Sequence, residues 1–248
     1  MWGVKMSAEV IMVASGKGGT GKSTVAVHVG ARLAARGHRV LLVELDSGLR
    51  SVDYIAGVSG KTVYDIGDIL SGRCEPAKAI VESGLYPGLF VVCAPYEGGD
   101  IRPEALASFI GSARMVFSHI ILDTAAGMGV PFAAARAVAD RALLVVTPDP
   151  VALRDGRIVC DALNTGGCGE VRLVINKVPR TLAGTGLQDL DECIDTVGAR
   201  LIGVVPESAP LAAAGARSAP LDGADRAAQA LDAVAARLCG EEIPLTVR

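Results

Sequence analysis

One short segment, SGKGGTGKST at 15–24, constrains the fold of this chain more than any other part of it. It lies between an apolar run, EVIMVAS at 9–15, and the longer segment GKSTVAVHVGARLAARG at 21–37. In the longer segment valine and leucine recur every four residues, and Gly37 supplies a helix stop. The order therefore predicts a buried strand, a tight glycine-rich loop and a helix in immediate succession.

The loop contains the residue types that phosphate binding requires. Gly16, Gly21, Lys22 and Ser23 fit the pattern G-x-x-x-x-G-K-[ST]. Glycines let backbone N–H groups converge on phosphate oxygens, a lysine neutralises the β- and γ-phosphates, and a serine hydroxyl can bind Mg²⁺. The following helix directs its positive N-terminal end toward the phosphates. The predicted nucleotide-binding residues of the loop are Gly16, Lys17, Gly18, Gly19, Thr20, Gly21, Lys22, Ser23 and Thr24.

The rest of the chain alternates apolar runs of strand length with alanine-rich segments of helical length. Strands apolar on both faces and joined by helices are typical of a parallel sheet covered on both sides. We therefore predict one α/β domain over residues 1–248, with a doubly wound, mainly parallel sheet flanked by helices. The strand order stays open. The further expected strands are 39–45, 88–95, 119–124, 141–148, 171–178 and 201–206, and a last helix at about 223–239 should pack on the sheet through Leu231, Val234 and Leu238.

Composition and charge restrict both the classes of partner and the cellular compartment that we expect. The formal net charge of −3 lacks the basic excess of a general nucleic-acid binder. No apolar run approaches the roughly 18 residues of a membrane span, and the N-terminal run is too short and broken for a signal peptide. The six cysteines have no metal-ligand spacing, which favours a reducing compartment. We therefore expect a cytoplasmic protein, with any membrane association made through partners.

Two aspartates are suitably placed for a metal ion. Asp46 ends the second expected strand, and ligands of doubly wound sheets bind at the carboxyl ends of the strands. Asp123 ends the apolar run HIIL, an arrangement in which a carboxylate holds Mg²⁺, often through water. We predict that Ser23, Asp46 and Asp123 surround the metal and that Asp46 can also orient an attacking water. A turn role for Asp46 and a helix-cap role for Asp123 are the alternatives.

Lys17 is a second lysine at the start of the same loop. The phosphates already have a cation in Lys22, so a second lysine in so tight a loop would often point away from its own nucleotide. It could then reach a nucleotide held by another subunit, as an arginine finger does in trans. The alternative is a solvated loop lysine.

These segments together resemble the MinD/ParA family of P-loop ATPases. KGGTGKST at 17–24 is similar to the deviant Walker A motif of that family, and the resemblance extends over about residues 9–243. It implies the P-loop NTPase fold, ATP with Mg²⁺, and a homodimer in the ATP state in which Lys17 crosses to the partner's nucleotide. Segments closer to the MinD branch are LDSGLRSVDYIAG (45–57), DTAAGMG (123–129), TPDPVALRDGRIV (147–159) and GVVPESAPL (203–211).

The resemblance also implies roles outside the loop. Asn176 would read the adenine edge, with a turn role as the alternative, and Pro206 would lie against the base. Lys17, Lys22 and Asp46 would act in a slow hydrolysis of ATP that a protein partner stimulates. Two positions depart from the family pattern: Glu44 stands where an aspartate is frequent, and Ala125 stands where proline is usual. A direct role for Glu44 stays open.

Several functions remain in competition at this point. The leading one is a MinD-like, ATP-driven dimerisation switch in the spatial regulation of cell division, with a protein activator or division regulator as partner. The alternatives are a ParA-like DNA segregation ATPase, which the acidic balance and Gly48-Leu49-Arg50 disfavour, a metal-insertion ATPase and a non-hydrolysing scaffold. An electron-transfer ATPase would need cysteines that the segment 123–132 lacks.

The closing residues TVR at 246–248 supply no basic amphipathic helix, so we expect no bilayer binding by this stretch.

Overall fold

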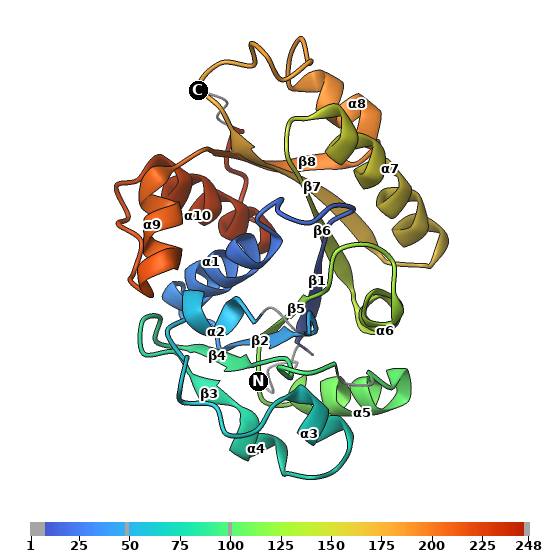
Figure 1. Ribbon diagram of the computed structural model, residues 1–248, viewed down its shortest axis with the longest axis vertical. Helices are drawn as coiled ribbons and strands as arrows, with labels where there is room; N and C mark the ends of the chain where they lie inside the picture. The colour runs from blue at the N-terminus through green and yellow to red at the C-terminus, as the bar shows by residue number, and fades with distance from the viewer. Residues whose placement is uncertain (1–7, 48–49, 99–100, 246–248) are drawn as a thin grey trace, which may run out of the picture.

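The computed structural model describes residues 8–47, 50–98 and 101–245. Over these residues the strands form one sheet in the order β3-β4-β2-β5-β1-β6-β7-β8, and only the β3–β4 pair is antiparallel. The mainly parallel sheet is therefore confirmed (Figure 1). The strands are β1 (Glu9–Ala14), β2 (Val40–Glu44), β3 (Val81–Glu82), β4 (Leu89–Val92), β5 (His119–Asp123), β6 (Arg141–Val146), β7 (Glu170–Val178) and β8 (Arg200–Pro206).

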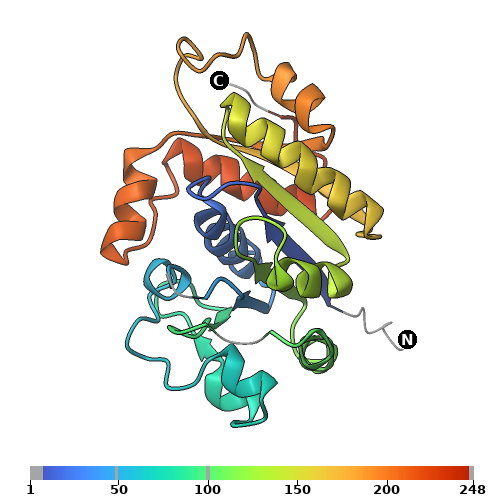
Figure 2. The same ribbon diagram turned by 45° about the vertical axis from the view of Figure 1, so that its right-hand side comes forward.

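Helices cover both faces of the sheet (Figures 1 and 2). One face packs against α1, α2, α9 and α10, and the other against α3, α5, α6, α7 and α8. No helix in the described ranges is both long enough and apolar enough to cross a bilayer. The helices are α1 (Lys22–Ala35), α2 (Val52–Ile55), α3 (Ile66–Leu70), α4 (Pro76–Ala79), α5 (Pro103–Ala113), α6 (Val130–Val138), α7 (Pro150–Thr165), α8 (Asp191–Val197), α9 (Ala209–Arg217) and α10 (Arg226–Leu238).

Alternating side chains explain why both faces are covered. Along β1, Val10 and Met12 enter one hydrophobic cluster while Ile11 and Val13 enter the other, and all four are fully buried. Successive strand residues point to opposite faces, so a strand that is apolar throughout needs a helix layer on each side. This is the doubly wound arrangement that the sequence predicts.

The last helix packs as expected. Leu231, Val234 and Leu238 of α10 are buried in the cluster that also contains α1. The approach of α10 to β8 is so close that a Cβ atom on Gly203 would collide with Val234. Glycine at this strand position therefore allows the helix to rest directly on the sheet.

The segment between β2 and β4 departs from the sequence-based expectation. It forms the short helices α2, α3 and α4 and the two-residue strand β3, none of which was predicted. Such pieces are too short to show a periodic pattern, and local hydrogen bonds hold them instead. In α3, for example, Asp65 and Asp68 form a reciprocal capping box. Residues 48–49 and 246–248, on which two of the expectations fall, lie outside the described residues.

The topology places the predicted site at one edge of the sheet. β1 lies between β5 and β6, and β5 also pairs with β2. Asp123 at the end of β5 is in register with Val13 of β1 and Glu44 of β2. The glycine-rich loop after β1 and the carboxyl ends of β2 and β5 therefore meet, as expected for a ligand site in a doubly wound sheet.

Candidate nucleotide-binding site

The glycines of the loop have distinct structural reasons. Gly19 and Gly21 adopt φ values of 80° and 86°, in the left-handed region that other residues avoid. Gly16 instead lies against α7, where an added Cβ would be 2.5 Å from the backbone carbonyl of Asp155. The loop therefore needs glycine twice for its turns and once for its contact with a neighbouring helix.

The N-terminus of α1 opens into a cleft of about 220 Å³. Its cap residue is Gly21, no side chain caps it, and its first turn contains no acidic residue. The first N–H groups of the helix therefore remain available for an anion. The cleft is lined by the predicted loop from Lys17 to Thr24, together with Asp46.

A buried ion pair lies behind the cleft. The Lys22 Nζ is 2.6 Å from Asp123 Oδ1 and 3.9 Å from Asp46 Oδ2. The Lys22 side chain is 7% exposed and that of Asp123 is fully buried, whereas Asp46 is 42% exposed at the rim. Burial raises the pKa of the Asp123 carboxyl, and the Lys22 ammonium opposes this effect. The structure thus brings together three residues that sequence reasoning assigned to one site.

The oxygen atoms here suit a magnesium ion. Asp123 Oδ2 is buried and has no hydrogen-bond partner among the described residues. Ser23 and Asp46 line the adjacent cleft and offer a hydroxyl and a carboxylate. Hard oxygen ligands of this kind fit Mg²⁺, which usually completes its coordination with water and phosphate oxygens. The residues present therefore fit the predicted ion.

Lys17 takes a different direction from Lys22. Its Nζ lies 3.4 Å from Asp149 Oδ1, and its side chain is 45% exposed. Asp149 caps α7 by accepting a hydrogen bond from the Ala152 N–H. Lys17 therefore pairs at the rim with the start of a neighbouring helix and leaves Lys22 as the buried cation of the loop.

A local irregularity in β7 holds the loop from behind. The pairing of β7 with β8 shifts between Ile175 and Val178. Within this bulge the Asn176 side chain donates to the Thr20 carbonyl at 2.8 Å, and the Lys177 Nζ donates to the Gly19 carbonyl at 2.7 Å. Two successive loop carbonyls are thus fixed by two successive strand residues.

Lys177 has a positive φ of 55°, which is uncommon for a lysine, and sequence analysis did not assign it a role. In the sequence, only its position next to Asn176 could have indicated that Lys177 contacts the loop. Asn176 itself is 3% exposed and lies against the loop. Its assignment to the adenine stays a prediction. So does that of Pro206, which ends β8 opposite Val178 and is not among the residues that line the cleft.

Glu44 has a structural task that sequence analysis did not foresee. Its buried carboxylate accepts hydrogen bonds from the N–H groups of Ser51, Val52 and Ala94 at 3.1–3.2 Å. Burial raises the pKa of Glu44 to about 7. Through these bonds Glu44 joins the segment after β2 to the end of β4. The loop that carries Asp46 is thereby anchored on its far side.

The segment after Asp123 also contacts the loop. Gly127, with a φ of 85°, donates its N–H to the Ser15 carbonyl at 3.0 Å. Thr124 donates its hydroxyl to the Val13 carbonyl at 3.0 Å. The segment that follows β5 is therefore hydrogen-bonded both to β1, through Thr124, and to the start of the glycine-rich loop, through Gly127.

Comparison with known proteins agrees with this geometry. Residues 11–221 match the CobQ/CobB/MinD/ParA nucleotide binding domain. The chain belongs to this family. Membership accounts for the phosphate-binding loop, since this is a family of nucleotide-binding ATPases, and it confirms the resemblance and the fold class that the sequence predicts.

Within the family the chain is similar to MinD proteins. It is 32% identical to the septum site-determining protein MinD of Bacillus subtilis over 246 residues, which covers 96% of this chain and 92% of that protein. A MinC:MinD cell division protein complex from Aquifex aeolicus contains a chain with 32% identity and a TM-score of 0.89, with 97% and 99% of the two chains covered. MinD of Pyrococcus horikoshii, solved with Mg-ADP, shares the fold at 22% identity and a TM-score of 0.82, with 93% and 96% covered.

Proposed function

We propose that this protein is a MinD-type ATPase whose two subunits associate when Mg-ATP is bound and separate after hydrolysis. The observation that carries the proposal is that the two lysines of the loop differ in burial and in position. Lys22 is buried with Asp123 beside the phosphate-binding helix, while Lys17 lies exposed at the rim. A buried cation can reach only the nucleotide of its own subunit, whereas an exposed cation at the rim can also reach a nucleotide held by a second subunit.

The residues of the site suggest how ATP would be handled. Lys22 and the N–H groups at the start of α1 would hold the phosphates, so that the terminal phosphorus faces the rim of the cleft. Magnesium, when bound, neutralises charge on the phosphate oxygens. Asp46, exposed on that rim, would orient the water that attacks the phosphorus and releases ADP.

Lys17 would complete this site from the partner subunit. Charge accumulates on the phosphate oxygens as the terminal phosphoryl group is transferred, and a cation supplied in trans stabilises it. In this structure Lys17 is paired with Asp149 at 3.4 Å. Such a half-exposed ion pair is worth about 1 kcal/mol or less, so Lys17 can exchange Asp149 for a phosphate at little cost.

The similarity to MinD proteins suggests a place in cell division. The Aquifex aeolicus neighbour is described as a MinC:MinD complex, and we infer that this chain likewise acts through a protein partner that reads its nucleotide state. ATP-dependent association would create a joint surface for that partner, and hydrolysis would remove the surface.

The test is the mass of the protein in solution with different nucleotides. We expect Asp46→Asn to bind Mg-ATP but hydrolyse it slowly, and therefore to elute as a dimer with Mg-ATP and as a monomer with Mg-ADP. Size-exclusion chromatography with light scattering measures both states. A mass that does not change between the two nucleotides at tens of micromolar protein would contradict the proposed switch.

The ParA-like alternative requires ATP-dependent binding to DNA without sequence preference. Such binding depends on phosphate contacts and weakens steeply with salt. The formal charge of −3 does not favour it. Retention of a random DNA duplex by the Mg-ATP form at 50 mM salt, and its loss at 300 mM, would favour segregation over division.

A further inference from the structure

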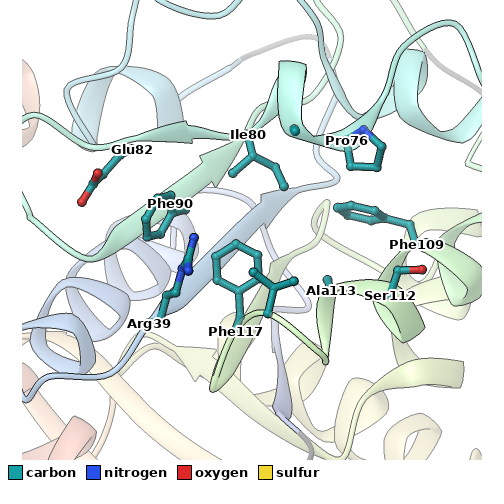
Figure 3. Close-up of a pocket in the computed structure, with 11 residues that line it drawn as sticks. Arg39, Pro76, Ile80, Glu82, Phe90, Phe109, Ser112, Ala113 and Phe117 are labelled. Atoms are coloured by element: carbon teal, nitrogen blue, oxygen red, sulfur yellow. The ribbon is translucent and has the colours of Figure 1, made fainter.

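A second cavity, of about 550 Å³, is lined by the side chains that Figure 3 shows. It lies at the opposite edge of the sheet from the nucleotide cleft. Arg39 and Phe117, which line it, lie close before the start of β2 and β5, whereas the cleft lies at the carboxyl ends of these strands. The other walls come from α4, from β3 and β4, and from the last turn of α5. No lining residue is shared between the two sites, so this cavity is separate from the site of the function proposed above.

The cavity is lined mainly by apolar side chains. Phe109 and Phe117 are largely buried, and Phe90 meets Phe117 edge to face with ring centroids 5.5 Å apart. Ile80 and Val116 complete the apolar walls, and Val116 remains 53% exposed at the mouth. Sites for small molecules typically enclose about 300–1,000 Å³ and combine an apolar body with a few polar groups. This cavity has that size and that lining.

One cation is held over this apolar surface. The guanidinium carbon of Arg39 lies 4.9 Å from the ring centroid of Phe90 and 5.3 Å from that of Phe117. Within the described residues these ring contacts are the only partners of the Arg39 guanidinium, and no carboxylate lies within ion-pair distance of it. Glu82, the acid in the wall, instead accepts a hydrogen bond from the Gly88 N–H at 3.0 Å. The cavity lining therefore combines an arginine that has no carboxylate partner among the described residues with a glutamate that is hydrogen-bonded to the backbone.

We propose that this cavity binds a small amphipathic carboxylate. The alkyl or aryl body of the ligand lies among the phenylalanines, and its carboxylate pairs with the Arg39 guanidinium. Arginine offers a planar pair of N–H donors that matches a carboxylate, and the two rings below keep that plane in place. The unpaired guanidinium of Arg39 thus favours an anionic head group, and the apolar walls favour an alkyl or aryl body.

The first measurement is calorimetric titration of the 248-residue protein with octanoate and decanoate, without nucleotide. We expect saturable binding of one molecule per chain. Decanoate should bind about tenfold more tightly than octanoate, because each methylene that leaves water adds a similar increment of affinity. Neutral 1-octanol should bind about tenfold more weakly than octanoate, since it forms no charged pair with Arg39.

Two variants assign the binding to this cavity. Arg39→Gln should abolish the preference for octanoate over octanol, and Ser112→Phe, an exposed position on the wall, should block both ligands. Lys78→Gln is the matched control, because it removes an exposed positive charge on α4 outside the lining. Thermal unfolding of each variant checks the fold, and ATP binding should stay unchanged in all three.

Four results would overturn the proposal, and the first three concern the wild type and the two cavity variants. These three are uptake of decanoate without saturation, equal affinity of the wild type for octanoate and octanol, and unchanged octanoate binding in both Arg39→Gln and Ser112→Phe. A loss in Lys78→Gln as large as that in Arg39→Gln would also contradict it, because a general surface charge would then explain the binding.

Discussion

Lys22 has its charge compensated within the protein itself. It lies 2.6 Å from Asp123 and 3.9 Å from Asp46, and the Lys22–Asp123 pair is almost completely buried. Removing one member of such a pair leaves an uncompensated buried charge, which typically costs about 3–5 kcal/mol. We therefore interpret Lys22 and Asp123 as residues on which both the fold and the phosphate site depend. A variant at either position would therefore change stability and phosphate binding together, and the two effects could not be separated.

A variant of Asn176 can distinguish adenine recognition from support of the loop, because the first role affects ATP alone and the second affects ATP and GTP equally. If its amide reads adenine, Asn176→Ala should weaken ATP by about tenfold and leave GTP almost unchanged, since a lost base contact is worth about 1–1.5 kcal/mol. Competition binding with a fluorescent nucleotide measures both affinities. Equal losses for ATP and GTP would instead mean that Asn176 only supports the loop through the Thr20 carbonyl.

His28 predicts a pH dependence of stability that does not involve the site. Burial lowers the pKa of this α1 histidine to about 4, and its Nε2 has no hydrogen-bond partner among the described residues. Between pH 6.5 and 4 the unfolded chain binds a proton that the folded protein does not, so stability falls as the pH falls through this window. The maximum contribution is roughly 3 kcal/mol.

The variant His28→Leu should therefore have a flatter stability profile. Urea unfolding at pH 7 and pH 5 should give a smaller loss of unfolding free energy in the variant than in the wild type. The wild type is the reference, because His119, whose pKa burial also lowers to about 4, is present in both proteins and contributes equally. Identical losses in wild type and His28→Leu would mean that His28 is protonated equally in both states.

At the scale of single residues, the sequence was more informative about which residues belong to the site than about which residues they contact. It predicted Lys22, Ser23, Asp46 and Asp123 because their chemistry follows from the motif and from strand ends. It could not predict that Glu44 anchors the loop after β2, because its three N–H donors come from two segments that only the fold brings together. The Asp149 partner of Lys17 lies 132 positions away and was equally invisible.

At the scale of elements, the glycine-rich loop is held on two sides. The bulge in β7 donates hydrogen bonds to two of its carbonyls, and α7 packs directly against Gly16. A loop fixed in this way has its N–H groups arranged before a phosphate binds. The ordering cost of binding is thereby reduced.

Gly16→Ala tests the contact with α7. Its Cβ would lie 2.5 Å from the Asp155 carbonyl, so helix and loop must separate, which should lower the unfolding free energy by about 1–3 kcal/mol. Gly18→Ala is the matched control, because no atom lies within 4 Å of an added Cβ at that position. Denaturant unfolding without nucleotide compares the two. Equal stability of both variants would exclude the proposed constraint.

The long strands and the helices α1 and α10 were predicted, whereas the short elements and the long helices α5 and α7 were not assigned positions. Apolar runs gave every long strand within one to three residues, because a strand buried on both faces leaves an unmistakable pattern. The short strand β3 pairs antiparallel at the sheet edge through Val81 and Glu82 only. Two residues carry no periodic signal, and their pairing depends on the neighbouring β4.

At the scale of the whole molecule, two cavities lie at opposite edges of one sheet. The nucleotide cleft lies at the carboxyl ends of the strands, and the cavity around Arg39 lies near the amino ends of β2 and β5. A second subunit that receives Lys17 must therefore approach the carboxyl edge. The opposite edge remains accessible in such a dimer.

Mixing two inactive variants tests the central claim, that Lys17 acts on the partner's nucleotide. Lys17→Ala keeps its own Lys22 and Asp46 but cannot supply a lysine, whereas Asp46→Asn can supply Lys17 but cannot hydrolyse. In a two-fold dimer of one of each, the Lys17→Ala subunit has a complete site.

The measurement is the ATPase rate of an equimolar mixture of the two variants. Each variant alone should be almost inactive, and the mixture should recover about a quarter of the wild-type rate, since half of the dimers are mixed and one of their two sites works. A mixture that stays as inactive as its components, with each variant still binding ATP, would contradict the action of Lys17 across the dimer.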